Sequence, residues 1–198
     1  GTINIFNIGL YFIVLMLFAF SVLLLIKFFG IGPLINGIDQ NVNLKTRNYA
    51  EKNMRKLISS GRNFSVLMAE YRDFSEFNHE YGYEQGDKAV KDLADEIKSI
   101  VSEFGEKASS VFYYDEDRFV VVLPRDTEEI AKKLIEEMEI HIPILCEDKN
   151  SNYYLLHISC AVISCEAGKV KNIGEIMQKG GKIIKDVKEK PGSSYLKV

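Results

Sequence analysis

The sequence lacks a strong excess of either charge. Its 25 Lys and Arg residues stand against 28 Asp and Glu residues, which gives a net charge of −3. A protein that binds nucleic acid through bulk electrostatics carries a strongly basic surface, so no nucleic-acid partner is expected. Cysteine is also scarce, and the 3 cysteines form no C-x-x-C pair, which argues against a disulfide scaffold or a zinc ribbon. Apolar residues still make up 46% of the chain, which excludes a disordered tail.

The beginning of the chain lacks charge altogether, because no charged residue precedes Lys27. From Ile8 to Ile26 only Gly9 and Ser21 interrupt the apolar run. About 20 apolar residues are needed to cross a bilayer. A secretory signal peptide has a shorter apolar core behind a basic start, and a core helix that is apolar on every face needs a larger protein around it. The sequence therefore predicts a transmembrane helix over residues 3–29.

The residues after this segment indicate its orientation. Excess Lys and Arg close to a membrane span remain in the cytoplasm. The basic residues that follow are Lys45, Arg47, Lys52, Arg55, Lys56 and Arg62. We therefore expect a single-pass protein of the inner (cytoplasmic) membrane, with the lipid bilayer as a partner and the soluble part in the cytoplasm. A reducing compartment also suits unpaired cysteines.

Residues 30–61 connect this segment to the rest of the chain. Gly30 and Pro33 end the apolar helix, and apolar residues then recur at roughly helical spacing, which predicts a juxtamembrane connecting helix over 34–60. Two interpretations of this helix stay open. It transmits a signal by pairing with another helix, or it is a solvated linker near anionic lipid.

Residues 62–198 read as alternating strands and helices. The predicted strands span 64–71, 110–114, 118–123, 153–164 and 195–198, and the predicted helices span 73–80, 86–104, 127–138 and 173–187. Asp126 is the expected N-cap of the third of these helices. Strands 110–114 and 118–123 are joined too closely to be anything but antiparallel neighbours. This order predicts an α+β domain with a central, mainly antiparallel sheet flanked by helices.

Three stretches carry a resemblance to a known family. They are MAEYRDFSEFNHEYGYEQGDKAV (68–90), FYYDEDRFVVVLP (112–124) and LHISCAVIS (156–164). They resemble the GGDEF domain of diguanylate cyclases. Five residues match the first motif of that family without gaps: Phe74, Asn78, Gly82, Gly86 and Asp87. The resemblance implies the nucleotidyl-cyclase palm fold. Active members condense two GTP molecules into cyclic di-GMP with the help of two divalent metal ions.

The resemblance also implies site residues. Glu70, at the end of the first strand, and Asp117, in the hairpin, fall where the family holds its metal ions. Asn78 and Asp87 fall where the family hydrogen-bonds guanine, and an amide and a carboxylate suit that base. A structural role is the alternative for this second pair, because Asn78 can cap a turn and Asp87 can begin a helix favourably. Magnesium is expected only together with a bound nucleotide.

The sequence departs from the family where the chemistry occurs. The signature positions are Asp115 to Phe119, so two carboxylates replace the glycines that let backbone approach the triphosphate, and Arg118 replaces a catalytic Glu. Arg72 stands at a second acidic position. The R-x-x-D motif through which the product inhibits family members is missing at 106–109. Residues 187–193 correspond to the triphosphate-binding pattern, but they lack its Arg, and their Lys is out of register. Ordinary cyclase chemistry is therefore not expected, and the sequence favours a non-enzymatic role.

The Asp-Arg-Phe pattern is similar to the degenerate GGDEF-like module of membrane-bound cyclic-di-AMP phosphodiesterases, where that module is regulatory. We therefore expect a membrane-anchored, degenerate GGDEF-like domain over 62–198, acting as a regulatory or dimerisation module in cyclic-dinucleotide or nucleotide signalling. Its partner would be a second copy of the chain or another membrane or signalling protein. Two alternatives stay open: an enzyme with residual metal-dependent GTP or ATP chemistry, and a ligand-free scaffold in an envelope complex.

Overall fold

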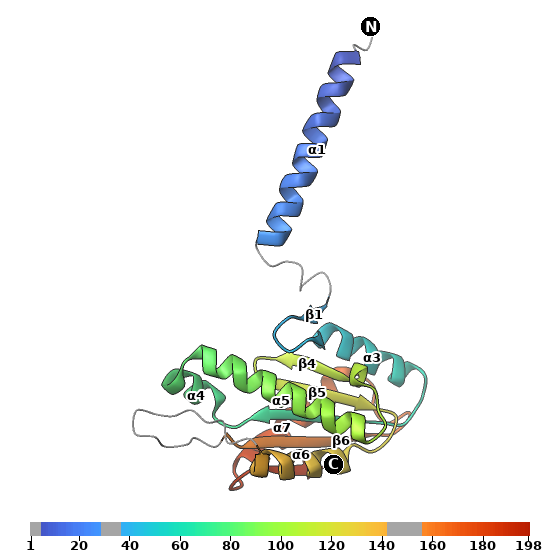
Figure 1. Ribbon diagram of the computed structural model, residues 1–198. Helices are drawn as coiled ribbons and strands as arrows, with labels where there is room; N and C mark the ends of the chain where they lie inside the picture. The colour runs from blue at the N-terminus through green and yellow to red at the C-terminus, as the bar shows by residue number, and fades with distance from the viewer. Residues whose placement is uncertain (1–4, 29–36, 142–155) are drawn as a thin grey trace. The chain divides into compact units, whose positions relative to one another are not determined.

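The computed structural model describes residues 5–28, 37–141 and 156–198. The chain divides into two compact units, Gly1–Ile38 and Asp39–Val198, which are described separately. The first contains one long helix, and the second contains a sheet with helices on both faces (Figure 1).

Helix α1 spans Ile5–Phe28 and lies within the apolar segment. Its described large apolar side chains are exposed all round, for example Leu15 and Phe18 at 68% each. The hydroxyl of Ser21 donates to the Phe18 carbonyl at 3.0 Å, so this polar group is satisfied within the helix. Among the described residues, no helix is both long enough and apolar enough to cross a membrane. The transmembrane helix over 3–29 therefore stays a prediction.

The second unit is built on a seven-stranded sheet with the order β1-β2-β4-β5-β3-β6-β7. The strands are β1 (Ile38–Asp39), β2 (Leu44–Thr46), β3 (Phe64–Tyr71), β4 (Val111–Asp115), β5 (Arg118–Leu123), β6 (Ile158–Cys165) and β7 (Ser194–Lys197). The central pairs β4–β5, β5–β3 and β3–β6 are antiparallel. Toward the edges, β2–β4 and β6–β7 are parallel, so the sheet is mixed rather than only antiparallel. Strand β7 follows β6 through a helix, and such a crossover returns the chain in the same direction.

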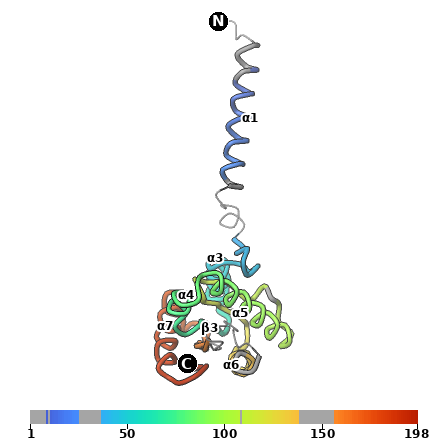
Figure 2. The backbone as a smooth tube through the Cα atoms, turned by 60° about the vertical axis from the view of Figure 1, so that its left-hand side comes forward, coloured from blue at the N-terminus to red at the C-terminus, as the bar shows by residue number. Residues whose placement is uncertain are grey.

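Every residue of β3 is buried, which places this strand in the middle of the domain. Leu67, Ala69 and Tyr71 face one core, together with α5 (Tyr83–Glu103) and α6 (Glu128–His141). Val66 and Met68 face the other core, with α3 (Arg47–Ser59) and α7 (Ile173–Lys188). Figure 2 shows β3 in the centre with helices on either side. The period-two alternation of side chains along a strand thus divides the apolar residues between two helical layers.

The helix expected over 34–60 is wrong in its first part. Helix α3 begins only at Arg47, and the residues before it form β1, a turn and β2, while 29–36 lie outside the described residues. In the turn, the Asp39 carboxylate accepts the N–H groups of Asn41 and Val42, and Asn43 has a φ of 52°. Such an Asx turn competes with the helix for the same backbone groups. The buried Val42 therefore packs in the core of the sheet domain.

The other predicted elements are found close to their expected ranges. Helices α4 (Phe74–Tyr81) and α5 are separated only by Gly82, whose φ of 88° suits glycine. A short 3-10 helix, η1 (Ala108–Ser110), precedes β4. Strand β6 begins at Ile158, and the earlier part of the expected strand, 153–155, lies outside the described residues. The palm-like α+β architecture is confirmed.

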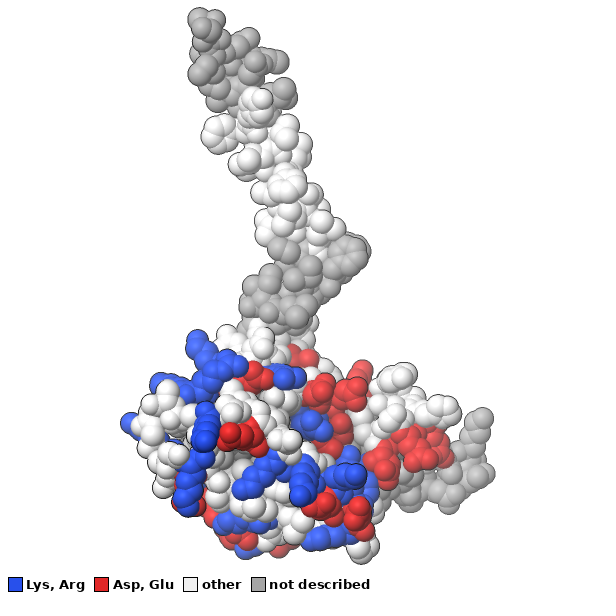
Figure 3. Space-filling view, turned by 180° about the vertical axis from the view of Figure 1, so that it is seen from behind, with Lys and Arg blue, Asp and Glu red and all other residues white. Residues whose placement is uncertain are grey.

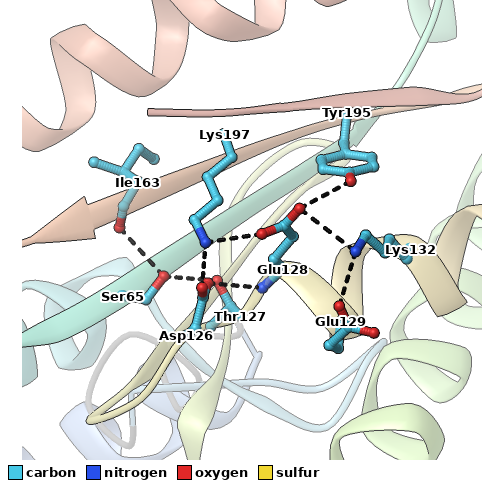
Figure 4. Close-up of polar contacts among 9 residues, drawn as sticks. All are labelled: Ser65, Asp126, Thr127, Glu128, Glu129, Lys132, Ile163, Tyr195 and Lys197. Atoms are coloured by element: carbon cyan, nitrogen blue, oxygen red, sulfur yellow. Dashed lines mark hydrogen bonds and ion pairs between the residues drawn. The ribbon is translucent and has the colours of Figure 1, made fainter.

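A polar cluster ties β7 to the beginning of α6 (Figure 4). The ammonium of Lys197 contacts the carboxylate of Asp126 and lies 2.8 Å from that of Glu128. The hydroxyl of Tyr195 donates to Glu128 at 3.1 Å. Asp126 also accepts the Glu128 N–H at 3.1 Å, as expected of a residue at a helix start. Strand β7 is therefore bound both to its neighbour β6 in the sheet and to the beginning of α6.

Candidate functional site

The first candidate site residue is Glu70, near the end of β3. It is 5% exposed, and both oxygens of its carboxylate are bound by side-chain cations. Arg118 Nε lies 2.5 Å from one oxygen, and Lys188 Nζ lies 2.7 Å from the other. These cations come from β5 and from the last turn of α7. A buried carboxylate needs such partners, because isolated burial of its charge is costly.

Asp117, in the turn between β4 and β5, is the second predicted metal ligand. Its carboxylate accepts the Tyr71 N–H at 2.8 Å. Burial, followed by the nearby Glu70 charge, raises the pKa of Asp117 to about 6, although the Tyr71 N–H and Lys188 oppose the rise. The fold thus brings the two predicted carboxylates together, as the resemblance implied. Within the described ranges, no group of three or more His, Cys, Asp or Glu side chains is arranged to hold a metal ion.

The hairpin tip has an unusual backbone for its residues. Glu116 has a φ of 34°, a region that glycine enters without cost and that a side chain makes unfavourable. The register between β4 and β5 shifts between Tyr113 and Asp115. The Tyr113 hydroxyl donates to the Glu116 carbonyl at 2.6 Å and so holds the turn. The chain therefore keeps a glycine-like turn here although the glycines of the family signature are absent.

The predicted nucleotide-binding residue Asn78 packs against Gly86, and the other, Asp87, is the next residue along the chain. A Cβ on Gly86 would lie 1.8 Å from Asn78 Oδ1, so only glycine leaves room for this amide. The buried Asn78 Oδ1 accepts no hydrogen bond from the described residues. Asp87 is exposed, and its backbone carbonyl accepts the Asn41 side-chain N–H at 3.3 Å. The Asn78 side-chain oxygen is therefore a buried acceptor, while the backbone N–H of Gly82 donates to the backbone carbonyl of Asn78 at 3.0 Å.

Tyr71 connects the two pairs. Its backbone N–H donates to Asp117, and its hydroxyl donates at 3.0 Å to the carbonyl of Ala89 on α5, two residues after Asp87. The carboxylate pair and the Asn78–Asp87 pair therefore belong to one end of the sheet. A nucleotide base at one pair and its phosphates near the other would follow the arrangement that the resemblance implied.

Sequence reasoning did not predict the contacts of two cations at this site, Lys188 and Arg72. Lys188 lies in the segment whose Lys is out of register with the triphosphate-binding pattern, and it binds Glu70 instead. Arg72 donates through one guanidinium nitrogen to the Lys190 carbonyl and through the other, at 3.2 Å, to the Val187 carbonyl. It thereby holds the C-terminal end of α7 beside Glu70, where a cation also interacts favourably with the helix dipole. The sequence feature that could have predicted these contacts is the reversal of charge at positions 72 and 118, because an arginine there needs acidic or carbonyl partners.

Comparison with protein families gives one match that covers most of the chain. The family described as "Diguanylate cyclase, GGDEF domain" matches residues 36–194. The chain belongs to the GGDEF domain family. The match begins before the predicted boundary at residue 62 and includes β1, β2 and α3. No curated protein sequence matches the chain.

Solved structures support the same fold. The GGDEF domain of FimX from Pseudomonas aeruginosa is 13% identical, with a TM-score of 0.66 over 82% of this chain and 99% of that one. The GGDEF domain of DgcB from Caulobacter crescentus, in complex with c-di-GMP, is 15% identical, with a TM-score of 0.63 over 81% and 95%. The diguanylate cyclase SiaD from Pseudomonas aeruginosa, in complex with its activator SiaC, is 13% identical, with a TM-score of 0.67 over 97% and 77%. At these identities the likeness concerns the fold.

Proposed function

We propose that this GGDEF domain is catalytically degenerate and acts as a membrane-anchored regulatory or dimerisation module in cyclic-dinucleotide or nucleotide signalling. Its apolar N-terminal segment would anchor it in the cytoplasmic membrane, with the domain on the cytoplasmic side. Its partner would be a second copy or another signalling protein. The fold relatives lend support, since DgcB was solved with c-di-GMP and SiaD with an activator protein.

One observation carries this proposal. Both oxygens of the Glu70 carboxylate form ion pairs, one with Arg118 and the other with Lys188. Metal-assisted phosphoryl transfer requires carboxylate oxygens that are open to a divalent ion. Here the two side chains supply the positive charge that a metal ion would supply, and a metal would have to displace both. We therefore expect any nucleotide to bind without Mg²⁺ and to remain unchanged.

The Asn78 amide supports a retained binding role. Its Oδ1 is buried and without a hydrogen bond in the described part of the chain, and a buried acceptor in that state favours a ligand that donates to it. A guanine base offers such donors along one edge. Asn78 and Asp87 would bind the base, and neither would take part in chemistry.

The test is thermal unfolding of the full chain in detergent micelles with GTP, ATP, cyclic di-GMP and cyclic di-AMP, each with Mg²⁺ and with a chelator. A ligand at 100 times its dissociation constant adds about 2.7 kcal/mol, or a shift of several degrees. We expect at least one nucleotide to stabilise the protein equally with and without Mg²⁺. Asn78→Ala and Asp87→Ala should abolish the shift, whereas Asp186→Ala, an exposed carboxylate on α7, should keep it.

Product analysis in the same samples separates the alternatives. Formation of a cyclic dinucleotide from GTP or ATP, lost in Glu70→Gln, would show an enzyme and overturn the proposal. Absence of any shift at millimolar nucleotide would instead indicate a scaffold without a ligand.

A further inference from the structure

A groove lies outside the site described above, between β2, α3 and β4. Its volume of about 710 Å³ is within the roughly 300–1,000 Å³ typical of small-molecule sites. Phe112, which is 2% exposed, contributes to its wall, and the half-exposed ring of Tyr49 flanks it. None of its lining residues belongs to the Asn78–Asp87 pair or to the Glu70–Asp117 pair.

The groove differs from the rest of the protein in its charge. Lys45, Lys52, Arg55 and Lys56 line it, and no acidic residue does so within the described chain. Seen from behind in Figure 3, Lys and Arg side chains gather on the side of the domain where α3 lies. The whole chain nevertheless has a net charge of −3. Four cations gathered on a protein of net negative charge create a local positive electrostatic potential at the groove.

Most of this charge is not neutralised within the protein. Arg55 forms an ion pair with Glu51 at 2.8 Å, but none of the three lysines forms an ion pair with another described residue. Lys45 instead lies 5.4 Å from the centre of the Tyr49 ring. On α3, Tyr49, Lys52 and Lys56 follow one another at the spacing that places residues on one face of a helix, and Lys45 lies on the neighbouring strand β2. Like charges held side by side repel, and a bound anion removes that repulsion.

We propose that this groove binds a phosphate-bearing anion, carried by a soluble nucleotide or by a lipid headgroup. Phosphate offers several charged oxygens in a small volume, which suits several lysine ammonium groups converging from β2 and α3. The aromatic ring of Tyr49 gives the non-phosphate part of the ligand an apolar contact. This site is independent of the proposed Asn78–Asp87 site and does not depend on a metal ion.

The test uses inorganic tripolyphosphate as the probe, with the full chain in dodecyl maltoside micelles and a chelator present. Binding is measured by calorimetry for the wild type and for Lys52→Gln/Lys56→Gln. The matched control is Lys182→Gln/Lys185→Gln, two exposed lysines on α7 with the same change of charge. We expect the groove pair to weaken binding about tenfold and the control pair less than about twofold. Added salt should weaken the wild-type interaction.

Two further arms identify the source of the phosphate. Phosphatidylglycerol is added to the micelles as a competitor, and a weaker apparent affinity for tripolyphosphate assigns the groove to lipid headgroups. An unchanged affinity assigns it to soluble phosphates. Asn78→Ala should leave tripolyphosphate binding intact, which keeps this result separate from the nucleotide site. Absence of binding to wild type, or equal losses in the groove and control pairs, overturns the proposal.

Discussion

At the scale of single residues, Glu70 has partners that differ from those expected of a metal ligand. Its carboxylate is buried, while Arg118 and Lys188 are 32% and 35% exposed. Burial makes the carboxylate dependent on the two cations, but the partly exposed cations can regain water if the carboxylate is lost. The energetic consequences of removing each partner are therefore unequal.

Arg118→Ala should lower the free energy of unfolding by about 2 kcal/mol, because it leaves a buried carboxylate with a single cation. Glu70→Gln should cost less, because it removes the buried charge itself. Both are measured by urea denaturation at neutral pH. The control is Arg55→Ala, whose ion pair with Glu51 is on the surface and should be worth about 0–1 kcal/mol. A cost for Arg118→Ala no larger than that of the control would contradict this account.

Asp117 gives a pH-dependent prediction. Burial, followed by the Glu70 charge, raises the pKa of this carboxyl in the folded protein to about 6 from an ordinary value near 3.8. The folded state therefore binds the proton more tightly, so the stabilisation from the protonated form is complete below about pH 4 and is lost as pH rises through about 6. Asp117→Asn, which keeps the acceptor for the Tyr71 N–H, should remove this dependence.

The measurement compares the unfolding free energies of wild type and Asp117→Asn at pH 5 and pH 7 with a chelator present. The variant should gain about 1 kcal/mol relative to wild type on going from the lower to the higher pH. A constant difference between the two proteins would show that Asp117 ionises normally in the folded state.

At the scale of elements, helix α7 packs closely on the sheet at one point. A Cβ on Gly180 would lie 2.1 Å from the sulfur of Met68 on β3 and 3.2 Å from Ile163 on β6. A Cβ on the next residue, Gly181, would meet nothing within 4 Å. Glycine at the first position permits close approach of helix and sheet, whereas glycine at the second only weakens the helix.

Gly180→Ala should therefore destabilise the protein by about 1–2 kcal/mol, because overpacking exceeds the gain in helix propensity. Gly181→Ala should stabilise it by up to about 1 kcal/mol, since it adds propensity without a clash. Thermal or urea unfolding of the two variants side by side gives the sign of each change. Equal effects at the two positions would mean that the helix does not approach the sheet as described.

At the scale of the whole molecule, the proposal of membrane anchoring concerns the segment that contains α1. Leu15 and Phe18 are exposed on that helix. Leu15→Arg/Phe18→Arg should move the protein from the membrane to the soluble fraction, because an arginine at the centre of a span costs about 2.5–3.5 kcal/mol. Leu15→Ile/Phe18→Leu should leave the distribution unchanged. The measurement is the distribution of the protein between membrane and soluble fractions after an alkaline wash. Wild-type protein in the soluble fraction would contradict the anchoring proposal.

Local patterns were sufficient for most elements. The apolar run of 64–71 predicted β3 with its observed bounds, and the three-and-four spacing after Gly86 predicted α5, although the helix begins earlier, at Tyr83. Local patterns failed at 38–46, because Ile38 and Val42, four residues apart, fit one face of a helix. The Asp39 turn and the pairing of β2 with β4, which is distant in sequence, decided the outcome.

The sequence by itself determined the family and the candidate residues, because the spacing of Asn78, Gly82, Gly86 and Asp87 and the alternation of strands are local properties. Only the tertiary structure decided what those residues contact. It joined Lys188 to Glu70 across more than a hundred residues of sequence. It also placed the parallel strands β2 and β7 beside their partners and gathered Lys45, Lys52 and Lys56 around one groove. Charge partners and pairing direction depend on chain segments that meet only on folding, so spacing within one segment cannot specify them.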